Sequence, residues 1–335
     1  MIIDNVMYNN IDDAVKIPQG LRLFRYSRGV MEKMNPAARQ MARYACNAEI
    51  RFVTDAPTCF ISLLSETGAA RIVVYYGDYV VGEHCLESGK ITKIALTVPS
   101  IISNLNEDFY KNNRFAKGVW RLHCHNCMLT VCDIDTMGYS IRIPKREEMP
   151  EHTMLSYGSS ISHGAGSYYN PMTYVNTTAN LLGADCLAKG VGGSCFAEPE
   201  IADDFAARDD WDFALLEIGV NMIRQSGIDS EEFKKRFDYF ADKMYSTGKK
   251  LVFLTIFPYS DLYANDEDIK KIIADFNRTI REKCSEFDKK RVMLVEGADV
   301  LTSTEMLSAD GIHPSTEGHI KMGYNLYNII KDFVG

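Results

Sequence analysis

The sequence predicts two domains of different fold class: an antiparallel, jelly-roll-like β-sandwich, then a three-layer α/β/α domain with a parallel five-stranded sheet. Three observations support this prediction. The apolar residues alternate with a period of two from about residue 48 to about residue 143, and strand-length and helix-length segments alternate after residue 150. The chain of 335 residues is long for one hydrophobic core. The charged segment 144–150, bracketed by prolines, is typical of a linker. We therefore expect domains at 1–147 and 148–335.

The amino-terminal domain is expected to consist mainly of short strands separated by turn residues, the pattern of an antiparallel sandwich. Residues 1–30 are predicted to be irregular apart from one strand at 21–26, and a short helical segment is expected within 31–46. The strands that follow are predicted at 50–54, 59–63, 71–76, 79–81, 90–98 and 140–144.

The carboxy-terminal domain is expected to alternate strands with helices, which implies a parallel sheet covered on both faces. Strands are predicted at 153–157, 184–188, 213–218, 250–256 and 292–295. Helices are predicted at 171–182, 197–206, 230–247, 266–284 and 315–333. Asp229 precedes Glu231 and Glu232, so it is expected to cap the third helix.

Composition excludes several classes of function. An apolar content of 46% and a charged content of 24% are ordinary for a globular protein. The net charge of −8 argues against a nucleic-acid partner, and no apolar run approaches a membrane span. No signal peptide is visible, and nine cysteines, an odd number, suit a reduced protein, so a cytoplasmic location is expected. No phosphate-binding glycine motif is present, and no cofactor is expected.

Ser160 is the candidate nucleophile. It follows the apolar segment Met154–Tyr157 at a Gly-rich turn, where an α/β fold presents a side chain at the carboxyl edge of its sheet. The alternative is an ordinary Ser/Gly-rich loop between a strand and a helix. A serine hydroxyl needs a neighbouring base to act as a nucleophile at neutral pH.

Asp310 and His313 can supply that base. A spacing of three places both side chains on one side of a tight loop. Histidine would accept the serine proton, and the aspartate would hold the histidine tautomer and stabilise the imidazolium. The alternative is a capped helix start, because Pro314–Glu317 follows directly.

An oxyanion hole can be composed of backbone and side-chain donors from three stretches. The backbone amides of Ser160 and Gly193 and the side-chain amide of Asn221 are the candidates. Gly192 is the neighbouring alternative for the glycine. The plain readings are a flexible loop for 190–193 and a turn residue for Asn221.

In this order, the serine block, the glycine loop, the asparagine and the Asp-x-x-His pair resemble the SGNH, or GDSL, hydrolase superfamily over about residues 153–333. The resemblance assigns Ser160, Asp310 and His313 to the triad and Ser160, Gly193 and Asn221 to the oxyanion hole. Ser159 stands where the family often has aspartate, and Met222 where many members have it. Neither residue belongs to the triad, so these two differences from the family affect the expected substrate class and not the expected reaction.

The resemblance, which extends to two-domain members with an amino-terminal β-sandwich, implies a serine esterase. We expect it to remove a small acyl group, first of all acetyl, from an oxygen of a carbohydrate or similar polar metabolite through an acyl-enzyme on Ser160. An acyltransferase using the same triad and a non-catalytic glycan-binding protein are the alternatives. The expected partner is a small-molecule or glycan ester, and homo-oligomer formation is left open.

The remaining chemical candidates are a Cys/His run and three residues after Ser160. His123, Cys124, His125 and Cys127, with Cys132 beyond, have a zinc-like composition, but the alternation along 120–130 favours a strand with cysteines in the core. No metal is expected. His163, Tyr168 and Tyr169 are expected on the rim of the cleft, and the alternative is a plain surface loop.

Overall fold

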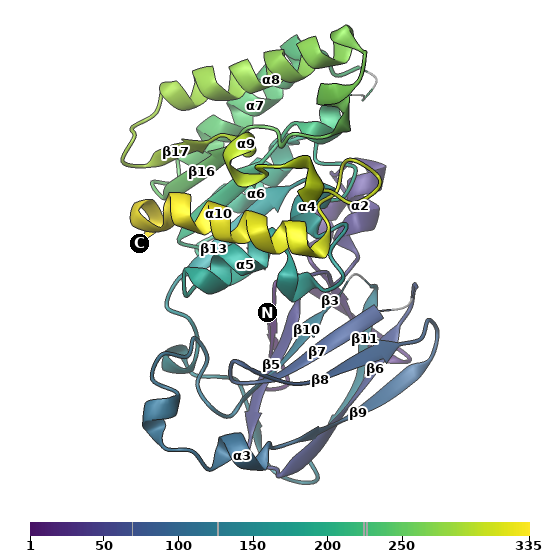
Figure 1. The fold of residues 1–335 in the computed structure, drawn as a ribbon. Helices are drawn as coiled ribbons and strands as arrows, with labels where there is room; N and C mark the ends of the chain where they lie inside the picture. The colour runs from purple at the N-terminus through teal and green to yellow at the C-terminus, as the bar shows by residue number, and fades with distance from the viewer. Residues whose placement is uncertain (69, 126, 224, 226) are drawn as a thin grey trace. The chain divides into compact units, whose positions relative to one another are not determined.

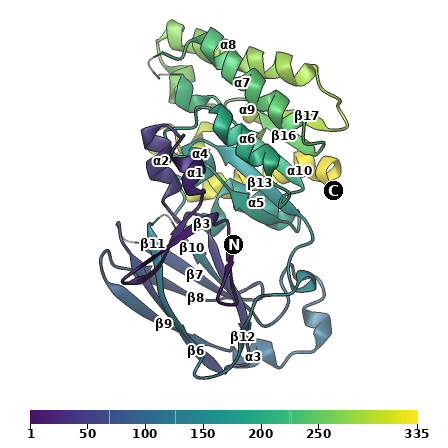
Figure 2. The ribbon, with the colours of Figure 1, turned by 180° about the vertical axis from the view of Figure 1, so that it is seen from behind.

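The computed structural model describes residues 1–68, 70–125, 127–223, 225 and 227–335 (Figures 1 and 2). The chain forms two compact units, one of residues 1–28 with 42–151, the other of residues 29–41 with 152–335. We predicted a change of domain after residue 147. The compact units change after residue 151, and residues 29–41 belong with the second unit.

Two antiparallel sheets make up the first unit, as predicted. One sheet has the order β1-β2-β5-β10-β7-β8, with β12 paired to β5, and the other has the order β3-β4-β11-β6-β9. The strands are β1 Ile2–Ile3, β2 Val6–Asn9, β3 Asp13–Ile17, β4 Gly20–Phe24, β5 Glu49–Thr54, β6 Thr58–Ser65, β7 Ala70–Tyr76, β8 Tyr79–Leu86, β9 Ile91–Thr97, β10 Val119–Cys124, β11 Leu129–Asp135 and β12 Ile141–Arg142.

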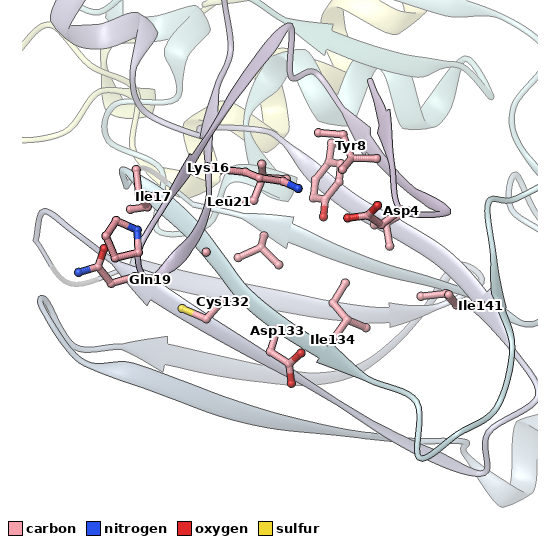
Figure 3. Close-up of a pocket in the computed structure, with 15 residues that line it drawn as sticks. Asp4, Tyr8, Lys16, Ile17, Gln19, Leu21, Cys132, Asp133, Ile134 and Ile141 are labelled. Atoms are coloured by element: carbon pink, nitrogen blue, oxygen red, sulfur yellow. The ribbon is translucent and has the colours of Figure 1, made fainter.

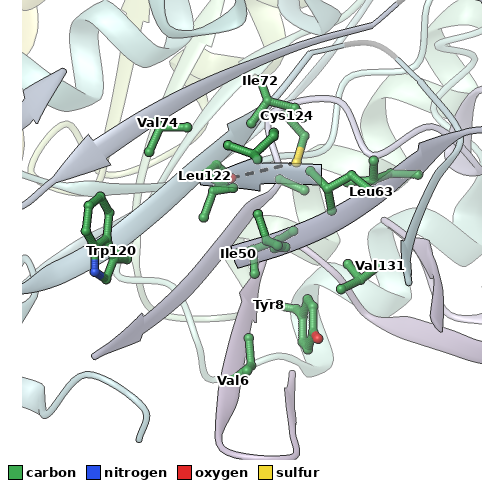
Figure 4. Packing of buried hydrophobic residues seen from close by; sticks show 14 of the residues in the cluster. Val6, Tyr8, Ile50, Leu63, Ile72, Val74, Trp120, Leu122, Cys124 and Val131 are labelled. Carbon is green, nitrogen blue, oxygen red and sulfur yellow. Dashed lines mark hydrogen bonds between the residues drawn. The ribbon is translucent and has the colours of Figure 1, made fainter. Parts of the chain in front are cut away.

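Alternate residues of these strands form an apolar core (Figure 4). Ile50, Phe52, Trp120 and Leu122 come from neighbouring strands of the first sheet, and Leu63 comes from the second. Two short helical segments follow β9 in the same unit: α3 Ser100–Ser103 and η1 Glu107–Phe109. A third, η2 Arg146–Glu148, lies in the segment that we predicted as a linker.

Two predictions for this unit are wrong. Residues 1–30 are not irregular, because β1, β2 and β3 precede β4. These strands are short, and Asp and Asn residues lie in the turns between them; Asp4 and Asn5 take positive φ angles at the hairpin between β1 and β2. Runs this short, interrupted by residues that are rare in strands, are not identified as strands by propensity. The run 120–130 is not one strand: it is divided between β10 and β11, which belong to different sheets. Asn126 lies outside the described residues.

The second unit contains a parallel sheet of five strands in the order β14-β13-β15-β16-β17, as predicted. The strands are β13 Thr153–Gly158, β14 Asp185–Ala188, β15 Phe213–Glu217, β16 Lys250–Leu254 and β17 Val292–Val295. The helices are α1 Arg28–Met31, α2 Pro36–Ala42, α4 Ser160–His163, α5 Tyr174–Leu181, α6 Pro199–Ala207, α7 Ser230–Tyr245, α8 Glu267–Ser285, α9 Gly297–Val300 and α10 Thr316–Val334. Shorter 3-10 turns are η3 Asn170–Met172, η4 Val220–Met222, η5 Ser260–Tyr263 and η6 Thr304–Met306.

Helices cover both faces of this sheet. Figure 1 shows α5 and α10 on one face, where Met154 and Leu215 of the sheet share a core with Val175 and Leu326 of these helices. Figure 2 shows α6 and α7 on the other side, where the ring of Tyr157 contacts aromatic rings of both helices. The predicted three-layer α/β/α arrangement is therefore confirmed, and the carboxyl ends of β13 and β15 meet at one edge of the sheet.

Candidate active site

Ser160 lies at the first position of α4, directly after β13. The side chain of Ser159 caps this short helix by accepting a hydrogen bond of 3.2 Å from the backbone N–H of Ile161. Gly164 ends the helix with a φ of 106°, a conformation that suits glycine. The sequence predicted a turn here and its first helix at 171–182. That prediction missed α4, because four residues are too few to produce a periodic pattern, and the next helix is the shorter α5 at Tyr174–Leu181.

The structure brings Ser160, His313 and Asp310 together in a hydrogen-bonded chain. Ser160 Oγ lies 2.8 Å from His313 Nε2, and His313 Nδ1 lies 2.7 Å from Asp310 Oδ2. An ionised carboxylate can only accept, so Nδ1 carries the proton and Nε2 is free to accept from the serine. The loop with His313 lies against the loop after α4: a Cβ on Gly166 would be 2.1 Å from the carbonyl oxygen of Pro314.

Asp310 is held in its ionised form by its own loop. Its Oδ1 accepts hydrogen bonds of 2.9 Å each from Ser308 Oγ and from the backbone N–H groups of Ile312 and His313. Partial burial raises the pKa of this carboxyl group, but the hydrogen bonds from His313, Ile312 and Ser308 outweigh burial and lower the pKa well below its ordinary value. The group that faces His313 is therefore an anion at neutral pH.

Three donor groups near Ser160 have no acceptor within the described part of the chain: the backbone N–H groups of Ser160 and Gly193 and the side-chain amide nitrogen of Asn221. The loop that contains Gly193 lies beside Ser160, because a Cβ on Gly192 would be 3.6 Å from the Cβ of Ser160. Val191 N–H donates to the carbonyl oxygen of Gly158 over 2.9 Å. Unoccupied donors at such a position suit an anionic oxygen.

His163 separates the two glycine candidates. Its Nδ1 accepts a hydrogen bond of 3.3 Å from the backbone N–H of Gly192. The Gly192 amide is therefore already engaged, which favours Gly193 as a donor to a ligand. We expected His163 on the rim of the cleft, and that expectation is wrong, because the side chain is 7% exposed and lies beneath the glycine loop. The side chain of Tyr168, by contrast, is 57% exposed, and the ring of Tyr169 contacts it.

The carboxamide of Asn221 has a defined orientation. Its Oδ1 accepts a hydrogen bond of 3.1 Å from the backbone N–H of Cys195. The oxygen end of the amide is thereby fixed on the loop after Gly193. The nitrogen end, which carries the donors, is left for another acceptor.

Glu217 is a buried acid in this site that the sequence did not single out. It ends β15, and its Oε2 accepts from the backbone N–H of Ser159 at 2.8 Å, from Ser159 Oγ at 2.7 Å and from Ser162 Oγ at 3.0 Å. Burial raises the pKa of Glu217 to about 7, although hydrogen bonds from Ser159 and Ser162 work in the opposite direction. One feature of the sequence could have identified it: Glu217 is an acidic residue within the apolar run 213–218, close to Asn221.

The Cys/His run lies in the first unit. Cys124 and Cys127 are buried in its apolar core, and burial raises the pKa of both thiols, so neither is a ready thiolate ligand. Among the described residues, no group of three His, Cys, Asp or Glu side chains is arranged to hold a metal ion.

A cavity of about 460 Å³ also lies in the first unit (Figure 3). Its walls include Val6, Leu21 and Val131, and Asp4 and Lys16 stand at its exposed side. It contains none of the predicted site residues.

No helix in the described part of the chain combines the length and apolar character of a membrane span.

Residues 156–320 match the model of the GDSL-like lipase/acylhydrolase family. Among curated proteins, a stretch of 114 residues is 32% identical to a multidomain esterase of Ruminococcus flavefaciens. That match covers 33% of this chain and 14% of the relative, so the chain spans only a small part of the relative's length.

Solved structures resemble the chain over nearly its whole length. A salicylyl-acyltransferase, SsfX3, from a tetracycline biosynthetic pathway has a TM-score of 0.79, with 13% identity over 96% of this chain and 93% of the other. A family two carbohydrate esterase from Clostridium thermocellum has a TM-score of 0.61, with 15% identity over 98% of both chains. At these identities the similarity shows a common fold, including a β-rich domain ahead of the hydrolase-type domain.

Proposed function

Residues 156–320 belong to the GDSL-like lipase/acylhydrolase family, and from this premise we propose that the protein is a serine esterase with Ser160 as its nucleophile. The observation that carries the proposal is the chain of hydrogen bonds from Ser160 through His313 to Asp310, at 2.8 Å and 2.7 Å. A nucleophile, a base and an acid that orients the base are the groups that acyl transfer requires.

The reaction has two steps on this site. In the first, His313 Nε2 takes the proton from Ser160 Oγ, which attacks the ester carbonyl carbon. The amides of Ser160, Gly193 and Asn221 stabilise the oxyanion, and His313 returns the proton to the departing alcohol. In the second, His313 takes a proton from water, which attacks the acyl carbon; His313 then returns the proton to Ser160 Oγ as the bond between Oγ and the acyl carbon breaks, which releases the free acid. Asp310 stabilises the imidazolium in both steps.

We further propose that the acyl group is small, in first place acetyl, and that it is removed from an oxygen of a carbohydrate or similar polar metabolite. The support is a likeness of fold to carbohydrate esterases, one of them an acetyl xylan esterase from Butyrivibrio proteoclasticus with a TM-score of 0.58. The exposed ring of Tyr168, in the loop beside His313, offers a flat apolar surface of the kind that stacks on a sugar.

Transfer to an alcohol other than water is the second candidate, favoured by the fold likeness to a salicylyl-acyltransferase over 96% of this chain. It uses the same acyl-enzyme and differs only in the second step. An added alcohol that raises the rate of p-nitrophenol release and is recovered in acylated form would assign the protein to the acyltransferases.

The test of the esterase proposal is hydrolysis of p-nitrophenyl esters of graded chain length and of acetylated sugars, together with labelling by a fluorophosphonate probe. We expect labelling of Ser160, the fastest turnover with the acetyl ester, and release of acetate from at least one acetylated sugar. A protein that neither turns over any ester nor reacts with the probe would instead be a non-catalytic, glycan-binding member of the fold.

A further inference from the structure

Residues 29–41, which precede most of the strands of the first unit, belong to the second unit and reach the loop that carries Gly193. Both views show α2 beside α4, the helix that begins with Ser160 (Figures 1 and 2). Asn35, immediately before α2, makes the contacts. Its Nδ2 donates to the carbonyl oxygen of Ser194 over 3.1 Å and to Glu198 Oε1 over 2.5 Å.

The Ser194 carbonyl belongs to the peptide group that orients Asn221. That peptide group joins Ser194 to Cys195: its C=O accepts from Asn35, and its N–H donates to Asn221 Oδ1 over 3.1 Å. One peptide unit is thus bridged between two asparagine side chains. A hydrogen bond to the C=O of a peptide also polarises its N–H, so the first bond strengthens the second.

Asn35 is itself held firmly at this position. Its Oδ1 accepts from the backbone N–H of Ala38 over 2.9 Å, which caps α2, and its own backbone N–H donates to Glu198 Oε1 over 3.3 Å. The Glu198 side chain is buried, so water does not compete for its hydrogen bonds with Asn35. The amide of Asn35 therefore has a single orientation, with its nitrogen toward Ser194.

We propose that Asn35 is a positioning residue that acts through Asn221: it holds the peptide group that sets the direction of the Asn221 side-chain amide toward the oxyanion. This inference rests on the proposed esterase function, and it makes the oxyanion hole depend on a segment of the amino-terminal part of the chain. Removing the Asn35 amide nitrogen is expected to lower kcat without changing KM, because the oxyanion forms only during the reaction.

The variant to test is Asn35→Ser, since serine still caps α2 but is too short to reach Ser194. We expect kcat for p-nitrophenyl acetate to fall about tenfold with KM unchanged, less than the roughly 10²–10³-fold loss when a whole donor is removed. Gln40→Ala, at an exposed position of α2, is the matched control and should match the wild type.

The deciding measurement is a double-mutant cycle with Asn221→Ala. If Asn35 acts through Asn221, Asn35→Ser lowers kcat by less than about twofold once the Asn221 amide is gone. Thermal unfolding and circular dichroism of each variant establish that it is folded. An equal loss of kcat in both backgrounds, or no loss in a folded Asn35→Ser, would overturn the role of Asn35.

The two proposals fail in different ways. A wild-type protein that neither hydrolyses esters nor reacts with a fluorophosphonate overturns the esterase proposal itself. An active, probe-reactive wild type with a folded and fully active Asn35→Ser variant overturns only the positioning role.

Discussion

The carboxyl group of Glu217 accepts two hydrogen bonds from Ser159, one from its backbone N–H at 2.8 Å and one from its hydroxyl at 2.7 Å. Ser159 stands where the family often has aspartate. The acid beneath the nucleophile turn in this chain comes instead from the end of β15, 58 residues later. A Cβ on Gly158 would be 2.6 Å from Glu217 Oε2, so the turn and the acid fit closely. We infer that Glu217 fixes the turn that presents Ser160.

Glu217→Gln tests whether the shape of this group or its charge matters. Gln can accept the same bonds through its oxygen, so we expect kcat within about fivefold of wild type, whereas Glu217→Ala removes every acceptor and should lower kcat by about 10²-fold. Steady-state kinetics on p-nitrophenyl acetate provide the comparison. Equal activity of the Ala variant and the wild type would show that the turn needs no support from Glu217.

The raised pKa of Glu217 predicts how the free energy of unfolding depends on pH. The pKa of Glu217 is raised from 4.5 to about 7 in the folded protein, so between these values the folded state binds more protons than the unfolded state. The contribution of Glu217 to the free energy of unfolding is therefore fully present below about pH 4.5. It is lost as the pH rises through about 7, and the loss is about 3 kcal/mol. Urea unfolding at several pH values should show a smaller decline over this range in Glu217→Gln. An identical pH dependence in both proteins would contradict the raised pKa.

Ser160→Ala is expected to abolish turnover and probe labelling while the protein stays folded, because no second hydroxyl group among the described residues is hydrogen-bonded to His313 Nε2 and could take over the attack. Loss of a triad nucleophile typically costs about 10⁶ in kcat. The measurement is ester hydrolysis with circular dichroism as the folding control. A residual rate above a few per cent would show that Ser160 is not the nucleophile, and Ser159 and Ser162 would be tested next.

Asn221→Ala should lower kcat by about 10²–10³-fold and leave KM nearly unchanged, since the amide donates mainly to an oxyanion that exists only during the reaction. Initial rates over a range of p-nitrophenyl acetate concentrations separate the two constants. A change confined to KM would instead make Asn221 a substrate-binding residue.

Asp310→Asn removes the anion that holds the proton on His313 Nδ1. Asparagine can donate to that nitrogen, which favours the wrong tautomer, so we expect kcat to fall by about 10²–10⁴-fold with the fold retained. Rates measured from pH 6 to 9 test this expectation. A variant as active as the wild type at neutral pH would show that the His313 tautomer does not depend on Asp310.

Dialysis against EDTA is expected to leave activity unchanged. The nucleophile, the base, the orienting acid and three donors supply each step of the proposed reaction from protein groups alone. Activity before and after dialysis, with elemental analysis for zinc, is the measurement. Loss of activity that zinc restores would contradict both the proposed mechanism and the placement of the cysteines in the core.

Most of the order of elements could be predicted from the sequence, because it depends on local pattern, and the candidate triad was assigned from short motifs whose order resembles that of a known family. Alternating apolar residues predict strands, and the strand-helix alternation after residue 150 predicts a parallel sheet. Asp310 and His313 lie three residues apart on one loop, so their pairing is a local property. The strands β1 to β3 were not predicted, because each is too short to produce a periodic pattern and is stabilised by its pairing with neighbouring strands.

Only the tertiary structure determined which other residues support the site. Glu217 meets Ser159 because β13 and β15 are neighbours in the sheet, and Asn35 meets Ser194 across 159 residues of sequence. His163 Nδ1 accepts a hydrogen bond from the backbone N–H of Gly192, which lies 29 residues later in the chain. This contact distinguishes Gly192 from Gly193 as a candidate oxyanion donor. Such contacts depend on how loops and strand ends converge in space, and a single sequence contains no local pattern that specifies this convergence.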